Sequence, residues 1–464
     1  MLAIGIDAAE ATYVRRLLSE GAMPALAALL RRGRWSRVHS PAAVGSGTVW
    51  PTFFTGLPVE DHGVCSEWRW VPASMSLTRY DAGALVPFWS ALAAGERRVG
   101  LLDVPFAPFL DVTDGFEVSE WGPHDVLEGR TRVAPLSVAS LVQSEIDGHP
   151  YAAATVDATG PDDHEGLRAV AEASLQGIGL RGDLAVRLLS EVDPHLAVVV
   201  FTEIHHASHL LWHTIEPGDA DVPGDGTPDG PTVRQLYEAV DREVGRLVEV
   251  AGEDASVVVF ALHGMRATRG IPTVLPELLR ATGLAHAPTW RSQSWKERLV
   301  SAFGAAKRHS PAWARALYQR SAGHSLRVSL ARSTMLDALD WPRTRVFSLP
   351  TDQHGWLRLN LVGRERDGTV ALDDYAAVCE GLETALGALT AADGRPLVSD
   401  VLRTATGADE AAGNRLPDLV VHWADAAHDV GSPSLAALKL TGQHKSGGFC
   451  VAAGPVVGGL GDDV

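Results

Sequence analysis

Two short runs of apolar residues, at 195–203 and 256–262, place the strongest constraint on the fold of this chain. "HLAVVVFTE" and "SVVVFAL" are continuously apolar instead of alternating with polar residues, which is typical of strands buried on both faces of a parallel sheet. Between them, "TVRQLYEAVDREVGRLVEV" at 232–250 repeats its apolar residues with the spacing of an amphipathic helix. Together with "LAIGI" at 2–6, another strand candidate, these segments predict an α/β fold with a mostly parallel central sheet and helices on both faces.

A basic segment interrupts this pattern of strands and helices. Residues 291–345 contain two lysines and nine arginines against three acidic residues. We expect 271–344 to form a basic helical insertion or cap, and 1–270 with 345–464 to form the core of the fold. A solvated basic face on a helical excursion would have the same composition, so the role of the insertion is left open.

The overall composition limits the partners and the location of the chain. The formal net charge of -17 argues against binding to a nucleic acid polymer, which needs a basic face, so we expect a small ligand. No apolar stretch reaches the ~20 uncharged residues of a membrane span. The first residues lack the pattern of a secretory signal, which predicts a cytoplasmic protein without a membrane partner. Oligomeric state is left open.

Polar residues of a few types gather where the predicted strands end. Four histidines and a glutamate lie in "FTEIHHASHLLWH" at 201–213, directly after one buried strand, and an aspartate follows the first strand. Ligands of a parallel α/β sheet bind at the carboxyl ends of its strands, so these side chains are placed for chemistry. The candidates are Asp7, Ser46, His205, His209, His263 and His444. Any one of them alone would more often be structural, since a serine at a helix start is usually an N-cap.

The order and local sequence of these segments resemble the alkaline phosphatase superfamily, specifically its type I phosphodiesterase and nucleotide pyrophosphatase branch. In that branch an aspartate follows the first strand, a threonine or serine stands nine residues before "TG", and "HG" follows. The corresponding residues here are Asp7, Ser46, "TG" at 55–56 and "HG" at 62–63. "WLRLNLVGRERDG", "LPDLVVHW" and "GQHKSGGFCVAAGP" match further motifs, so the similarity covers nearly the whole chain outside 271–344. The resemblance implies an alkaline phosphatase-like core with a bimetal site.

The resemblance also implies roles for individual residues. Asp7, Ser46 and His263 match the ligands and the nucleophile around one metal ion, while His209 and His444 match the two histidines at the other. Ser46 would attack the ester and form a covalent intermediate, because a divalent ion lowers the pKa of a hydroxyl without a dedicated base. The implied activity is hydrolysis of a small anionic ester, a phosphodiester or a nucleotide pyrophosphate.

Two positions depart from the pattern of the branch. His205 stands where an aspartate is usual, and Leu262 stands where the aspartate of "DHG" is usual. His205 with the other two histidines would make a three-imidazole site that suits Zn²⁺, with Mn²⁺ as an alternative. Whether one or two ions bind is left open. Two other functions also stay open: a phosphoryl or sulfuryl transferase to an acceptor alcohol, and a degenerate, non-catalytic protein that binds a metal or an anion.

A second group of residues is expected to orient the ligands or contact the substrate. Its members are Glu203, His124, His354 and Arg358. A strand edge explains the last two almost as well, and Glu203 could serve either as a ligand or as the partner of an imidazole. Three more histidines are expected to serve the fold: His62, His206 and His213.

Overall fold

The computed structural model describes most of the chain and divides it into two compact units. The described residues are 1–122, 131–143, 149–150, 164–215, 232–268, 274–288, 336, 338–351, 354–424 and 441–455. Unit 1 comprises Met1–Pro58, Asp81–Ala267 and Lys439–Val464, and unit 2 comprises Val59–Tyr80 and Thr268–Leu438. Each unit has its own sheet and its own apolar core.

An eight-stranded sheet forms the centre of unit 1. In spatial order its strands are β2 (Gly33–Val38), β16 (Gly448–Ala453), β9 (Val257–Ala261), β1 (Leu2–Ile6), β8 (Leu196–Phe201), β5 (Val99–Leu102), β6 (Gly115–Ser119) and β7 (Arg132–Ala134). β1 pairs in parallel with β8 and β9, and β5 pairs in parallel with β6 and β8. β2, β16 and β7 add antiparallel pairs at the two sides. The prediction of a mostly parallel central sheet is therefore confirmed.

Helices connect the strands of this sheet. Those on one side are α1 (Ala11–Ser19), α2 (Pro24–Arg31), α6 (Leu136–Gln143), α8 (His164–Val192), α9 (Glu203–Leu211) and α10 (Val233–Ala251). The remaining ones are α3 (Val49–Thr55), α5 (Trp89–Ala94) and the short 3-10 helices η1 (Pro41–Ala43), η2 (Ser46–Thr48), η3 (Ala82–Ala84) and η4 (Trp212–Thr214). α1 and α2 are separate because Gly21 takes a positive φ of 75° and Pro24 starts the second helix.

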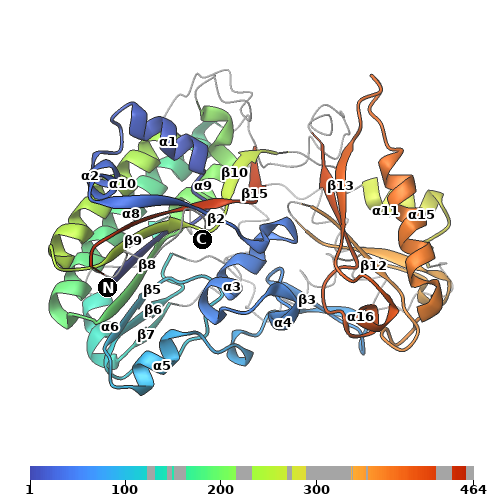
Figure 1. Cartoon of the computed structure of the whole chain (residues 1–464), viewed down its shortest axis with the longest axis horizontal. Coiled ribbons are helices and arrows are strands. Elements are labelled where there is room, and N and C mark those ends of the chain that lie inside the picture. The colour runs from blue at the N-terminus through green and yellow to red at the C-terminus, as the bar shows by residue number, and fades with distance from the viewer. Residues whose placement is uncertain are drawn as a thin grey trace. The chain divides into compact units, whose positions relative to one another are not determined.

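Side chains of the central strands are buried on both faces of the sheet. Along β8, Ala197, Val199 and Phe201 pack into one apolar cluster, whereas Val198 and Val200 pack into another. Figure 1 shows the consequence: α1, α2, α8 and α10 cover one face of this sheet, and α3 and α5 cover the other. This two-sided burial is the physical reason for the continuous apolar runs in the sequence.

A small two-stranded sheet brings the last described segment of the chain beside α9. β10 (Gly264–Ala267), which closely follows β9, pairs antiparallel with β15 (Gly442–Lys445). A Cβ atom on Gly442 would lie 2.2 Å from the Ser208 carbonyl oxygen and 2.9 Å from Cβ of Trp212. Only glycine therefore lets β15 approach α9 this closely, and the approach places the residues of β15 next to those of the helix.

Unit 2 is built on a separate antiparallel sheet. Its strands, in spatial order, are β11 (Val346–Leu349), β12 (Gly355–Leu359), β14 (Leu419–Trp423) and β13 (Val398–Arg403), and a second pair is formed by β3 (Trp68–Val71) and β4 (Ser76–Arg79). The helices are α4 (Val59–His62), α11 (Val274–Ala281), α15 (Tyr375–Gly387) and α16 (Ala408–Gly413), with 3-10 helices η5 (Trp341–Arg343) and η6 (Leu372–Asp374). α11 and α15 pack into the apolar core of this sheet.

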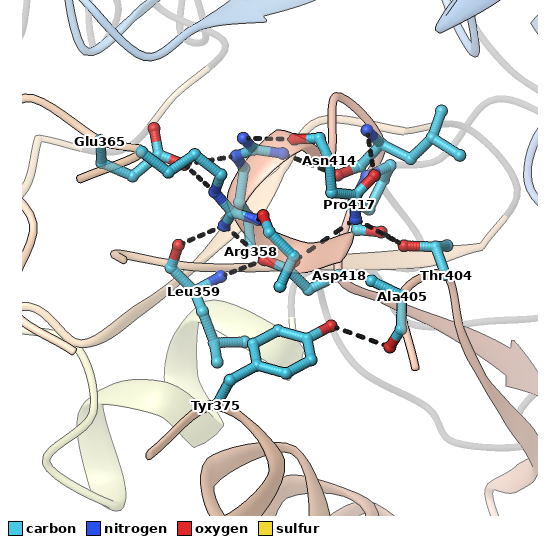
Figure 2. A network of polar contacts seen from close by, with 12 residues as sticks. Arg358, Leu359, Glu365, Tyr375, Thr404, Ala405, Asn414, Pro417 and Asp418 are labelled. Atoms are coloured by element: carbon cyan, nitrogen blue, oxygen red, sulfur yellow. Dashed lines mark hydrogen bonds and ion pairs between the residues drawn. The ribbon is translucent and has the colours of Figure 1, made fainter. Parts of the chain in front are cut away.

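A buried ionic network ties β12 to the loops of unit 2. Arg358, which is 1% exposed, donates from Nε to Glu365 at 2.8 Å and from Nη1 to the Leu416 carbonyl at 2.7 Å. Figure 2 shows its guanidinium among these groups and Asn414, whose carbonyl accepts a third hydrogen bond. Asp418 accepts from the backbone amide of the next residue on β12, at 2.7 Å. Burial of these charges is tolerated because each one is paired and hydrogen-bonded.

The predicted division into a core of 1–270 with 345–464 and an insertion at 271–344 stays a prediction. Within 345–464, β11 to β14 form the sheet of unit 2 together with its own apolar cluster. The pairing partners of a strand are set by tertiary packing, so the local sequence pattern did not reveal this grouping. Most of the predicted insertion, 289–335, lies outside the described residues. Among the described helices, none combines the length and the apolar composition that a membrane crossing requires.

Candidate functional site

The polar candidates of unit 1 lie where neighbouring strands of its central sheet end. Asp7 directly follows β1, and its backbone N–H donates to the Phe201 carbonyl at the end of β8, at 2.9 Å. α9 begins with Glu203, two residues after β8 ends, and His263 stands two residues after the end of β9. Because β1 lies between β8 and β9 and is parallel to both, the three strand ends meet at one edge of the sheet.

Three imidazoles from α9 and β15 meet through their Nε2 atoms at this edge. His205 and His209 are separated by about one turn of α9, and their Nε2 atoms lie 3.1 Å apart. His444 comes from β15, and its Nε2 lies 2.8 Å from that of His205. In the part of the chain that the structure describes, this is the only group of three histidine, cysteine, aspartate or glutamate side chains with the spacing of metal ligands.

Oxygen acceptors fix the other ring nitrogen of two of these imidazoles. His205 Nδ1 lies 2.7 Å from Asp7 Oδ2, and His209 Nδ1 lies 2.9 Å from the Gly442 carbonyl oxygen. A carboxylate and a carbonyl oxygen can only accept, so each Nδ1 donates, and Nε2 of a neutral ring then carries a lone pair. Burial, reinforced by the neighbouring His205, lowers the pKa of His209 to about 3, so this ring is neutral at pH 7.

Asp7 is held by two donors on opposite sides. Its Oδ1 accepts from the indole Nε1 of Trp50 at 2.9 Å, and its Oδ2 accepts from His205. The nearest nitrogen of His263 lies 4.0 Å from Oδ1, beyond hydrogen-bonding distance. Trp50 was not among the residues singled out in the sequence, because its place in an apolar helix gave no sign of where its N–H points.

His263 and Leu262 lie beside the three imidazoles. The His263 ring is 2% exposed, and its centroid lies 4.7 Å from that of His444 and 6.1 Å from that of His205. Leu262 packs in an apolar cluster that contains Trp50. A leucine side chain has no ligand atom, so Leu262 itself supplies no carboxylate beside His263.

Ser46 begins the 3-10 helix that leads into α3. Its side chain is half-buried, and within the described residues its hydroxyl makes no hydrogen bond. Trp50, the donor to Asp7, lies four residues further on in α3. The preceding helix η1 contacts both η2 and β15, which links the serine segment to the strand that carries His444. Ser46 itself has no contact of hydrogen-bond length with the imidazoles.

Glu203 belongs to a buried ionic network and not to the imidazole cluster. Its Oε1 accepts from Arg181 Nε at 2.8 Å and lies 2.9 Å from His149 Nε2. Arg181, which is 0% exposed, also donates to Asp103 at 2.6 Å. Burial alone would raise the pKa of Glu203, but Arg181 and His149 lower it to about 2, so the carboxylate stays ionised. The sequence gave no signal for Arg181, because most arginines on a helix reach solvent.

The other members of the second group of candidates have structural partners or lie outside the described part. His124 is outside the described residues. His354 and Arg358 belong to unit 2, where the His354 ring packs against His422 with centroids 4.6 Å apart and Arg358 is held in the network of Figure 2. Their observed contacts are those of the fold, because each packs or bonds to groups of its own unit.

The three histidines expected to serve the fold make local contacts. His206 stacks on His205 with centroids 4.8 Å apart, and His213 Nδ1 lies 3.3 Å from the Thr441 hydroxyl. His62 Nδ1 accepts from the Val64 amide at 3.0 Å. None of these contacts contradicts their assignment to the fold.

Solved structures of other proteins are similar in fold to this chain. The phosphonoacetate hydrolase of Sinorhizobium meliloti 1021 in complex with phosphonoacetate is similar, with a TM-score of 0.52 and 16% identity, covering 99% of this chain and 91% of that one. An inactive form of murine ectonucleotide pyrophosphatase/phosphodiesterase 5 in complex with AMP has a TM-score of 0.45 and 13% identity, covering 98% and 88%. A comparison with curated proteins finds no match.

The family itself follows from the sequence match. Residues 1–437 match the family described as type I phosphodiesterase / nucleotide pyrophosphatase. The chain belongs to this family, and the predicted resemblance is confirmed. It is therefore a phosphoester hydrolase by family.

Proposed function

We propose that this hydrolase acts on small anionic phosphate esters, most readily diesters or nucleotide pyrophosphates, with a divalent ion held by His205, His209 and His444 and with Ser46 as nucleophile. The family match supports the ester class. We propose the presence of the ion, the role of Ser46 as nucleophile and the kind of ester that is cleaved. A cytoplasmic location also stays a prediction.

One observation carries the ion: three ring nitrogens meet at hydrogen-bonding distance with too few protons to satisfy their contacts. Nδ1 of His205 is bound to Asp7 and Nδ1 of His209 to a carbonyl, so the neutral His209 ring presents a lone pair to His205 Nε2 at 3.1 Å. A single proton on His205 Nε2 can lie along only one of its two short N···N contacts, at 3.1 Å and 2.8 Å. A cation among the three nitrogens satisfies all of them, so these residues fit a metal ion.

The three imidazole nitrogens also indicate which ion would bind. Three neutral imidazole nitrogens suit Zn²⁺, whose nitrogen ligands lie at about 2.0–2.1 Å in a tetrahedral site that leaves one position open for substrate or water. Mn²⁺ prefers oxygen ligands, so it is the less suited ion for this set. When bound, the ion would supply positive charge to the ester and lower the pKa of a neighbouring hydroxyl.

Ser46 is the nucleophile in this proposal because its hydroxyl is accessible and uncommitted within the described residues. Its oxygen would form a bond to phosphorus while its proton passes to solvent water, and the bond to the leaving alkoxide would break as that oxygen takes up a proton from water. Water would then add to the phosphoryl–serine ester, releasing phosphate or a monoester and restoring the hydroxyl. Asp7 and the Gly442 carbonyl keep two imidazoles in the tautomer that presents Nε2.

A substrate panel on wild type and Ser46→Ala protein tests the proposal. The panel contains bis(p-nitrophenyl) phosphate, p-nitrophenyl phosphate, p-nitrophenyl sulfate and phosphonoacetate, each with Zn²⁺ present. We expect the phosphodiester to be cleaved fastest, and Ser46→Ala to lose at least roughly 10³-fold in kcat while binding Zn²⁺ as wild type does.

The matched control is Ser40→Ala, another half-buried serine six residues earlier, which should keep wild-type turnover. Full activity of Ser46→Ala would eliminate the serine as nucleophile. A zinc-loaded wild-type protein that cleaves none of the four compounds would favour a non-catalytic binding protein and overturn the proposal.

A further inference from the structure

The carboxylate of Asp7 is placed to orient an imidazole. It is 1% exposed, and each of its oxygens accepts from a different side chain: Oδ2 from His205 Nδ1 at 2.7 Å and Oδ1 from Trp50 Nε1 at 2.9 Å. His205 presents its opposite nitrogen to the other two imidazoles. Asp7 therefore lies on the Nδ1 side of the His205 ring, opposite the side where the three Nε2 atoms meet.

The residues around Asp7 do not provide the ligands of a second ion. Leu262 precedes His263 and packs in an apolar cluster, so it contributes no oxygen. Glu203, the nearest alternative carboxylate on α9, is bound to Arg181 and His149. Within the described residues, His263, the Ser46 hydroxyl and an already bonded Asp7 then remain for that position. Glu10, whose carboxylate lies against Gly264, is paired with Lys445 at 3.2 Å. The one anionic ligand of that set is already committed to His205 and Trp50, which favours a single ion at the three imidazoles.

We propose that Asp7 is a positioning residue for His205 and that the chain holds one divalent ion instead of two, an inference that rests on the proposed function. A carboxylate that accepts from a metal-bound imidazole fixes the ring orientation and tautomer and raises the basicity of the coordinating nitrogen. His205 Nε2 faces the other two imidazoles, so the ring needs such a partner at Nδ1 to present a lone pair there. Asp7 supplies it from the adjacent strand end.

The geometry explains why the aspartate cannot be exchanged for its amide. Asp7 accepts two hydrogen bonds through two oxygens, whereas asparagine has one accepting oxygen and one donating NH₂ group. In Asp7→Asn, either Trp50 or His205 loses its acceptor. If the NH₂ group faces His205, Nδ1 must accept, and the proton moves to Nε2, where it blocks the ion.

The first test is a Zn²⁺ titration of the full-length, metal-free protein against a chromophoric chelator. Wild type is expected to take up one tight equivalent, and Asp7→Asn is expected to take up one equivalent with roughly 10–100-fold lower affinity. Trp50→Phe is the matched control, since it removes the hydrogen bond to Oδ1 and leaves the one to His205. Its affinity should stay within about threefold of wild type.

The second test needs no variant and therefore does not depend on how Asp7→Asn folds. Long-range ¹H–¹⁵N spectra of the histidine-labelled protein report which ring nitrogen carries the proton, and His205 is expected to be protonated at Nδ1. In Asp7→Asn this signature should shift toward Nε2, which a merely structural aspartate would not cause.

Two results would overturn the inference: two tight equivalents in wild type, or an Asp7→Asn protein with one equivalent of unchanged affinity. The first result would mean that the chain holds a second ion, with Asp7 as a candidate ligand, and the second would show that His205 binds the ion without help from Asp7. A wild-type protein that binds no Zn²⁺ at all would instead remove the proposed function. In that case the tautomer of His205 still decides whether Asp7 positions it.

Discussion

The buried ionic network beneath α9 gives a quantitative prediction. Arg181 reaches Asp103 at 2.6 Å and Glu203, the first residue of α9, at 2.8 Å, and it is 0% exposed. In Arg181→Met the side chain keeps an unbranched apolar stem and loses the guanidinium with its charge, so two carboxylates remain buried without their cation. Removing one partner of a buried ion pair costs about 3–5 kcal/mol.

The remaining contacts place the expected loss at the lower end of that range. Asp103 still accepts from the amides of Trp121 and Gly122, both at 2.8 Å, and Glu203 still has His149 at 2.9 Å. We therefore expect Arg181→Met to destabilise this region by about 3 kcal/mol. Since every 1.4 kcal/mol is a factor of ten, the amides of α9 should exchange with solvent roughly 10²-fold faster.

Hydrogen–deuterium exchange of the peptides that cover β8 and α9 measures this change without assuming that both units unfold together. The control is Arg187→Met, six residues further along α8, whose ion pair with Glu191 involves side chains that are 35% and 48% exposed. An exposed pair contributes little, so this variant should change exchange by no more than about threefold. Exchange of α9 in Arg181→Met within about threefold of wild type would refute the reasoning.

Two further predictions concern histidines. His209→Ala should abolish the tight Zn²⁺ equivalent in calorimetry, whereas His213→Ala, whose ring bonds to Thr441, should leave it unchanged; equal loss in both would refute the ligand assignment. Burial and Arg415 lower the pKa of His62 to about 4, so its contribution to the stability of unit 2 is complete above pH 6.5 and falls as the pH drops toward 4. The loss is at most roughly 3 kcal/mol. In His62→Gln, the urea concentration at the midpoint of unfolding should depend less on pH between 6.5 and 4 than it does in wild type. A pH dependence equal to that of wild type would contradict this.

The central strands and the spacing of the imidazoles could be predicted from the sequence. β1, β8 and β9 were predicted because strands buried on both faces need continuous apolar runs. Two histidines four residues apart on a helix share one face. His205 and His209 show that spacing on α9. These signals are local, so they do not depend on which distant segment lies nearby.

The hydrogen-bonding partners of these residues could not be predicted from the sequence, because they depend on strand register. Asp7 meets His205, 198 residues away in the chain, since Ile6 of β1 is in register with Phe201 of β8. The resemblance implied a metal ligand at Asp7, and only the structure gives its hydrogen bonds. Arg181 was missed for a related reason, because burial of a single helical arginine follows from tertiary packing and leaves no local signature.

The grouping of 59–80 with 268–438 is another long-range effect. A small strand pair at β3 and β4 joins a unit whose other strands begin at Val346. Its core is formed by side chains from segments far apart in the chain, which periodicity within one segment cannot indicate. The grouping of these segments into a unit with an apolar core of its own therefore could not be predicted from the sequence.

The most direct test of the central claim is a single titration of the metal-free protein with Zn²⁺ in which bound ion and hydrolysis of bis(p-nitrophenyl) phosphate are measured together. We expect hydrolysis to be absent without the ion, to rise in proportion to its occupancy, and to level off at one equivalent per chain. Full hydrolysis by the metal-free protein, or none when the ion is bound, would contradict a phosphodiesterase built on His205, His209 and His444.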